Sequence, residues 1–110
     1  MIERDLIEKA VALLLEAAPG SKVILFGSAA RGDASEANDL DFLVVEPDGK
    51  EPYHEMVRLR EILEPLLGPK LLGADVLVIS AEKFDRWKEA PNTVYSEAAR
   101  QGRVYERSSP

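Results

Sequence analysis

Three short apolar runs, bounded by turn-forming residues, alternate with segments of helical periodicity along this 110-residue chain. The runs are Val23–Phe26, Leu40–Val45 and Val76–Ile79. Runs of this length between glycine, proline and aspartate are typical of buried strands, whereas apolar residues recurring every three or four positions indicate helices. The order of the segments predicts a small α/β or α+β domain in which helices cover one sheet.

The helices are predicted from both periodicity and capping residues. One occupies residues 3–18, a short one follows Ser28, and Pro52 opens a longer one that ends at Gly68-Pro69. Ser80 and Thr93 are predicted caps of two further helices, the second running from Val94 to Gln101. A final edge strand is expected at Val104–Tyr105. We expect a single domain over residues 1–107, with residues 108–110 frayed.

Composition excludes several classes of protein. There is no cysteine and only one histidine, His54, which excludes disulfide scaffolds, thiolate metal sites, cysteine catalysis and histidine-rich metal sites. The charged N-terminus lacks the apolar core of a signal peptide, and no apolar run approaches the ~20 residues of a membrane span. A soluble, cytoplasmic domain is therefore expected.

The net charge of −6 is concentrated in the middle of the chain. Residues 32–79 carry eleven acidic and four basic side chains. Because nucleic-acid binding depends on lysine and arginine neutralising phosphates, direct nucleic-acid binding is not expected. Cations or a basic protein partner suit this charge better.

The Gly27-Ser28 pair stands where the first strand meets a helix. Such a turn exposes backbone N–H groups to an anion such as phosphate, and glycine lets a ligand approach the backbone. A plain strand–helix turn with a serine cap is the simpler interpretation of this pair taken alone.

Carboxylates stand at the start of the second and third strands. Alternation places Asp39 and Asp41 on one face, about 6.6 Å apart along the strand. A Mg²⁺ ion between them would offset the repulsion of like charges. If the strand of Asp75 lies beside that of Asp41, three carboxylates converge, and three can hold two metal ions for phosphoryl chemistry. Taken singly, each acid is equally explained as a solvated residue at a strand entry.

The string Gly27-Ser28, ten residues, Asp39-Leu40-Asp41 resembles the signature of the minimal nucleotidyltransferases, of the DNA polymerase β-type superfamily. Asp75 falls where that family has its third carboxylate. The resemblance covers nearly the whole chain. It implies a mixed sheet flanked by helices, binding of Mg²⁺ and a nucleoside triphosphate, and nucleotidyl transfer to a hydroxyl. Many members neutralise a HEPN-type ribonuclease toxin, in some cases by adding AMP to a toxin tyrosine.

The resemblance also implies roles for single residues. Asp39 and Asp41 would ligate the metal that grips the triphosphate, and Asp75 would ligate a second metal and help deprotonate the acceptor. Gly27 and Ser28 would hold the β- and γ-phosphates, and Arg31 is a further candidate phosphate contact or else a solvated helix arginine. Larger relatives carry an extra acceptor-binding domain, so we expect a partner or a second copy to share the acceptor site.

Two other functions remain open at this stage. The domain could neutralise a HEPN-type partner by docking without catalysis, or act on a small molecule as aminoglycoside-modifying relatives do. His54 is expected at the surface. Phe84 and Trp87 are expected in the core rather than as a platform for a nucleobase. Tyr95 and Tyr105 could stack on a base or lie at an interface.

Overall fold

The computed structural model describes residues 4–31, 39–47 and 50–107. Its elements, in chain order, are α1 (Arg4–Ala17), β1 (Lys22–Phe26), α2 (Ser28–Arg31), β2 (Asp39–Glu46), α3 (Pro52–Leu67), the 3₁₀ turn η1 (Gly68–Lys70), β3 (Gly73–Ser80), α4 (Ala81–Trp87), α5 (Val94–Gln101) and β4 (Arg103–Glu106). The predicted order of helices and strands is confirmed.

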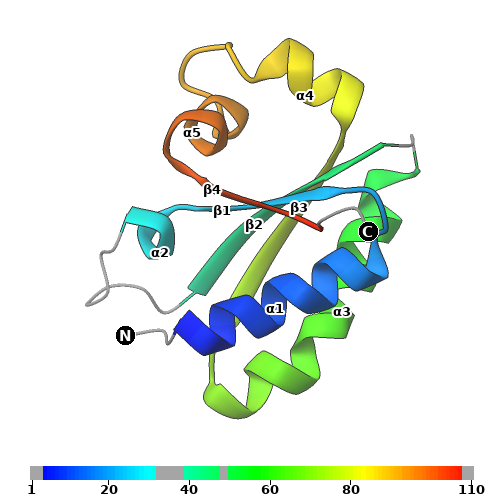
Figure 1. The fold of residues 1–110 in the computed structure, drawn as a ribbon, viewed down its shortest axis with the longest axis vertical. Coiled ribbons are helices and arrows are strands. Elements are labelled where there is room, and N and C mark those ends of the chain that lie inside the picture. Colours follow the sequence, from blue (N-terminus) through cyan, green and yellow to red (C-terminus); the bar gives the residue numbers. More distant parts are fainter. Residues whose placement is uncertain (1–3, 32–38, 48–49, 108–110) are drawn as a thin grey trace.

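The four strands form one mixed sheet in the order β3-β2-β1-β4. β1 pairs antiparallel with both β2 and β4, and β2 pairs in parallel with β3. The predicted fold class, a mixed sheet flanked by helices, is confirmed (Figure 1). The edge strand expected at Val104–Tyr105 is β4.

Helices cover both faces of the sheet. α1 and α3 lie on one face, and α4 and α5 lie on the other (Figure 1). Alternate residues of each strand enter one of two apolar clusters, so that Leu40, Phe42 and Val44 face α1 and α3, whereas Leu43 and Val45 face α5. This alternation also sends Asp39 and Asp41 to the α5 face.

The predicted caps hold the two C-terminal helices. Ser80 accepts a hydrogen bond from the backbone N–H of Lys83 (3.2 Å), and Thr93 accepts one from the N–H of Ser96 (3.1 Å). These bonds fix where α4 and α5 begin, and therefore which of their side chains face the sheet.

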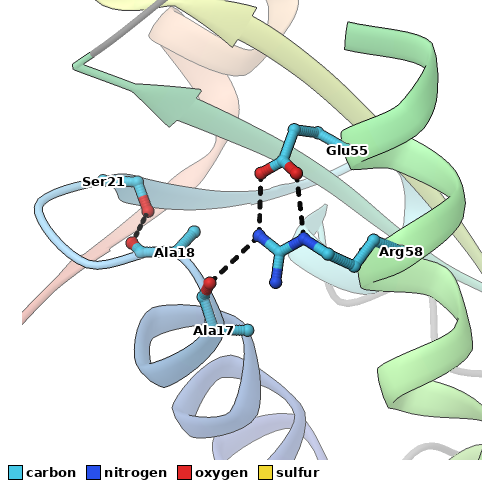
Figure 2. A network of polar contacts seen from close by, with 5 residues as sticks. All are labelled: Ala17, Ala18, Ser21, Glu55 and Arg58. Atoms are coloured by element: carbon cyan, nitrogen blue, oxygen red, sulfur yellow. Dashed lines mark hydrogen bonds and ion pairs between the residues drawn. The ribbon is translucent and has the colours of Figure 1, made fainter. Parts of the chain in front are cut away.

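One polar network ties α3 to the end of α1. The guanidinium of Arg58 donates to both oxygens of Glu55 (2.9 and 2.7 Å) and to the carbonyl of Ala17 (3.0 Å). Figure 2 shows this bidentate pair, together with the hydroxyl of Ser21, which donates to the carbonyl of Ala18. Charge-assisted bonds of this kind are among the stronger ones in proteins, so the network fixes the packing of α1 against α3.

Two predictions about individual residues need comment. Trp87 was expected in the core but is 51% exposed, because it is the last residue of α4 and extends beyond the sheet, whereas Phe84 does pack against the apolar cluster beneath α5. His54 is exposed, as expected.

Some predictions fall outside the described residues. These are the frayed end predicted at residues 108–110 and the first three residues of the predicted domain. Among the helices that are described, none is long and apolar enough to cross a membrane.

Candidate active site

The turn after β1 brings the backbone of Gly27 against the carboxylate of Asp41. Phe26 is the partner of Asp41 in the antiparallel pairing of β1 with β2, so Gly27 follows directly beside it. Gly27 has φ of +77°, and a Cβ placed on it would lie 2.4 Å from Oδ2 of Asp41. Glycine is required here for two reasons, since both the left-handed backbone and the neighbouring carboxylate disfavour a side chain.

The two acidic strand entries lie side by side. β2 and β3 pair in parallel with Asp41 opposite Asp75 and Asp39 opposite Gly73. The expectation that the strand of Asp75 neighbours that of Asp41 is therefore confirmed. All three acids stand at the end of the sheet where β1 finishes and β2 and β3 begin.

The electrostatics of the site centre on Asp41. Partial burial raises the pKa of its carboxyl, and the nearby charges of Asp75, Asp39 and Glu97 raise it further. Among these charges Asp75 has the largest effect, and it is the direct partner of Asp41 in the parallel pairing of β2 with β3. A ligand of positive charge at this point would relieve that repulsion.

Asp39 lies two residues before Asp41 on the same face of β2, opposite Gly73. Its carboxylate lies against the Cα of Gly73, where a Cβ would be 2.4 Å from Oδ1. In the part of the chain that the structure describes, no group of three or more carboxylate or histidine side chains is arranged to hold a metal ion. The structure thus places Asp41 directly opposite Asp75, with the Asp39 carboxylate on the same face of the strand pair, over Gly73.

The helices add two charged residues that were not among the predicted site residues. Glu97 of α5 forms an ion pair with Arg31 of α2 at 3.8 Å, and its charge reaches Asp41. Arg60 of α3 borders a hollow of about 310 Å³ together with Asp39 and Asp75. Neither residue belongs to the sequence motif that contains Asp39 and Asp41. The packing of α3 and α5 on the sheet brings both residues near these acids.

Ser28 and Arg31 belong to the short helix α2, which directly follows Gly27. Ser28 is its first residue, and Arg31 closes its single turn by donating its backbone N–H to the carbonyl of Gly27 (3.2 Å). The predicted phosphate-binding residues therefore stand beside the acidic strand entries.

Comparison with known proteins agrees with this arrangement. The sequence model of the family described as nucleotidyltransferase domain matches residues 7–106. The chain belongs to the nucleotidyltransferase domain family. No curated protein matches this nucleotidyltransferase domain.

Two solved structures are similar to this nucleotidyltransferase domain. One, assigned as a minimal nucleotidyltransferase, is 30% identical and has a TM-score of 0.59, and the match covers 94% of this chain and 95% of the other. The other is described as a toxin–antitoxin crystal structure with AMP-PNP. It is 20% identical and has a TM-score of 0.60, with 91% of this chain and 73% of the other covered. At that identity the second likeness concerns the fold.

Proposed function

We propose that this nucleotidyltransferase domain is a Mg²⁺-dependent minimal nucleotidyltransferase that transfers AMP from ATP to a hydroxyl of a partner protein. The partner we propose is a HEPN-type toxin, which makes this chain the antitoxin of the pair. The observation that carries the proposal is the pairing of Asp41 opposite Asp75 beside the bare Cα of Gly27.

The acidic residues suit a divalent cation in donor type. Carboxylate oxygens are the ligands that Mg²⁺ takes, and the missing side chain of Gly27 leaves the space that the Asp41 carboxylate fills. Asp39, which lies on the same face of the strand pair, would complete the set with Asp41 and Asp75. A metal held there would neutralise charge on the phosphates and on the leaving pyrophosphate.

The remaining roles follow from position. The backbone and hydroxyl at Gly27 and Ser28 would bind the β- and γ-phosphates, and Arg31 would contact the same phosphates from the end of α2. The acceptor oxygen forms a bond to the α-phosphorus while the bond from that phosphorus to the bridging oxygen breaks. Asp75 would accept the proton of the hydroxyl, and pyrophosphate leaves. The chain contributes position and charge rather than a covalent intermediate.

The proposal of a toxin partner draws on the similar structure described as a toxin–antitoxin with AMP-PNP. That protein is described with both a partner and a nucleotide analogue, which are the two ligands we propose here. The acidic charge of residues 32–79 suits docking to a basic protein surface.

The test is a transfer assay with labelled ATP, Mg²⁺ and the protein encoded beside the gene. We expect label on the partner, and none when Asp39→Ala or Asp41→Ala replaces the natural chain. Asp85→Ala is the matched control, because Asp85 is an exposed acid of α4 that pairs with Lys88 on the surface. Label that persists in the Asp41 variant would disprove the site.

A docking function without catalysis is the second candidate. It is favoured by the finding that no three acids in the described part of the chain are arranged to hold a metal. A tight complex with the partner, with no transfer of label and no effect of Asp41→Ala on toxin neutralisation, would support docking over catalysis.

A further inference from the structure

The chain passes from α3 into β3 through a turn that usually contains glycine. The backbone N–H of Leu71 donates to the carbonyl of Gly68 (2.9 Å). The N–H of Leu72 donates to the carbonyl of Leu67 (3.2 Å). These two bonds form a Schellman motif, in which the residue at the position of Leu71 has a left-handed backbone and is most often glycine. Leu71 has φ of 57° and ψ of 32°, so a leucine stands where the backbone favours glycine.

The two leucines of this turn have opposite surroundings. Leu72 packs against the apolar cluster that contains Leu67, and this contact usually accompanies the motif. Leu71 is 93% exposed, and among the large apolar side chains of the described residues none is more exposed. Leu71 therefore strains the backbone without filling the core. Strained positions of this kind concentrate at functional sites, so Leu71 is a candidate for a role outside the fold.

An exposed strip of β3 leads from Leu71 to the acidic site. Gly73 and Asp75 are both exposed, and alternation places them on one face of β3. Asp75 is four residues after Leu71, so the Cα atoms of the two residues are at most about 14 Å apart. Figure 1 shows this connection at the end of the sheet where β2 and β3 begin.

The size of protein interfaces indicates what covers Leu71. Under the proposed function, a partner protein brings a hydroxyl to Asp75. Stable interfaces cover about 800 Å² on each partner, and a disc of that area has a radius of about 16 Å. A disc of this size centred on Asp75 includes Leu71, whereas a small acceptor molecule at Asp75 would leave most of the same area uncovered. The acceptor protein is therefore the occupant that fits.

We propose that Leu71 is an anchor for the acceptor protein and inserts into an apolar pocket next to the hydroxyl that receives AMP. The inference rests on the proposed function, because transfer at Asp75 places the partner over this turn. Burial of one leucine side chain stabilises a complex enough to change its dissociation constant about tenfold or more. The hydrogen bonds of the turn hold Leu71 in place before the partner arrives, so little backbone freedom is lost on binding.

The test compares Leu71 variants of the full chain for binding to the protein encoded beside the gene. Leu71→Gly suits the left-handed backbone, so its midpoint of urea unfolding should equal or exceed that of the natural chain. Its dissociation constant for the partner should nevertheless rise about tenfold or more. A structural role of Leu71 would not produce a variant that is at least as stable and yet binds the partner less tightly.

Three further variants define what the partner recognises. Leu71→Asn keeps a side chain that tolerates the left-handed backbone but is polar, so it should weaken binding as Leu71→Gly does. Leu71→Met keeps an apolar side chain of similar volume and should retain most of the affinity. Tyr53→Ala is the matched control, because Tyr53 is 63% exposed and stands in the first turn of α3, which is about 24 Å long, whereas Leu71 follows its last turn. It should leave binding unchanged.

The transfer assay separates this inference from the proposed function. With Leu71→Gly, the partner concentration that gives half-maximal transfer should rise together with the dissociation constant. The affinity for ATP and the rate at saturating partner should be unchanged. If the natural chain binds the partner and transfers no label, the proposed function fails, and the comparison of affinities still decides whether Leu71 anchors the partner.

Three outcomes would overturn the inference. The first is that the natural chain forms no complex with the partner. The second is that Leu71→Gly and Leu71→Asn bind the partner as tightly as the natural chain does. The third is an equal loss of affinity in Tyr53→Ala, which would show that binding depends on exposed apolar side chains in general and not on this turn.

Discussion

Asp41 and Asp75 are direct partners across the parallel pairing of β2 with β3, so their carboxyls stand side by side on one face of the sheet. Partial burial raises the pKa of Asp41, and the neighbouring carboxylate of Asp75 raises it further, because two adjacent carboxyls cannot both be ionised without cost. The free protein is therefore less stable than it would be without the repulsion between these acids. Such pairs of acids are common at functional sites, where a bound ligand of positive charge offsets the repulsion between them.

The first prediction concerns the substitution Asp41→Asn. A raised pKa in the folded state means that stability falls as the pH rises above 3.8, the ordinary pKa of the group, and that the loss is complete above the folded-state pKa. The variant lacks this loss. Urea unfolding should show it to be as stable as the natural chain or slightly more so near pH 7, with the difference vanishing at about pH 3.

The same variant should be inactive in the transfer assay, since an amide is a poor replacement for a carboxylate ligand of Mg²⁺. Asp85→Asn, on the surface of α4, should change neither property. If Asp41→Asn fails to fold, Asp41 has a structural role and the interpretation of the site is wrong.

The second prediction concerns Gly27. Replacing it with alanine adds a Cβ at a φ of +77° and against Oδ2 of Asp41. We expect a loss of about 1–2 kcal/mol in the free energy of unfolding, together with weaker binding of ATP because Asp41 is displaced. Thermal unfolding and nucleotide titration measure the two effects.

Gly20 provides the matched control for Gly27. It has a similar φ of +83°, but a Cβ there would meet only Pro47, at an ordinary 3.4 Å. Gly20→Ala should therefore cost stability through backbone strain alone, about 1 kcal/mol, and leave nucleotide binding unchanged. Equal effects of both substitutions on ATP binding would contradict the role of Gly27.

The sequence was sufficient to predict what depends on local pattern. Alternation placed Asp39 and Asp41 on one face of a strand, and the caps at Ser80 and Thr93 form as expected. Which strand lies beside that of Asp75 depends on the strand order, and the sequence pattern did not determine that order. The structure shows that β3 pairs in parallel with β2.

Contacts between distant elements could not be predicted in this way. Glu46 extends β2 one residue beyond the predicted apolar run and is buried, although glutamate is rarely buried. Its neighbour Glu55 comes from α3. Trp87 has the spacing of a core residue, but it falls at the end of a short helix and stays exposed. At the ends of helices and strands, whether a side chain is buried depends on how far the neighbouring helices and strands extend.

The third prediction concerns the bidentate pair of Arg58 and Glu55 (Figure 2). Arg58→Met removes both bonds to Glu55 and the bond to the carbonyl of Ala17, and leaves a carboxylate that is only 10% exposed without its cation. We expect a loss of about 2 kcal/mol in the free energy of unfolding. Arg86→Met is the control, because Arg86 pairs with Glu82 at 3.6 Å on an exposed face and should change stability by less than about 0.5 kcal/mol.

The last prediction is a pH dependence of stability that arises from Glu46. Burial and the adjacent carboxyl of Glu55 raise the pKa of Glu46 to about 7, whereas the hydrogen bonds from Arg58 lower the pKa of Glu55 to about 2. From pH 4.5, the ordinary pKa of glutamate, to about 7 the folded chain holds a proton on Glu46 that the unfolded chain has lost, so stability decreases as the pH rises through this range. Below pH 4.5 the stability instead decreases as the pH falls, because protonation of Glu55 removes its pairing with Arg58.

Glu46→Gln isolates the first of these two effects. Its amide does not ionise, so the decrease between pH 4.5 and 7 should disappear. At about pH 8 the variant should be more stable than the natural chain by ~1–3 kcal/mol, measured by urea unfolding at a series of pH values. Glu61→Gln, an exposed change on α3, should keep the slope of the natural chain. If Glu46→Gln keeps that slope as well, another group holds the proton.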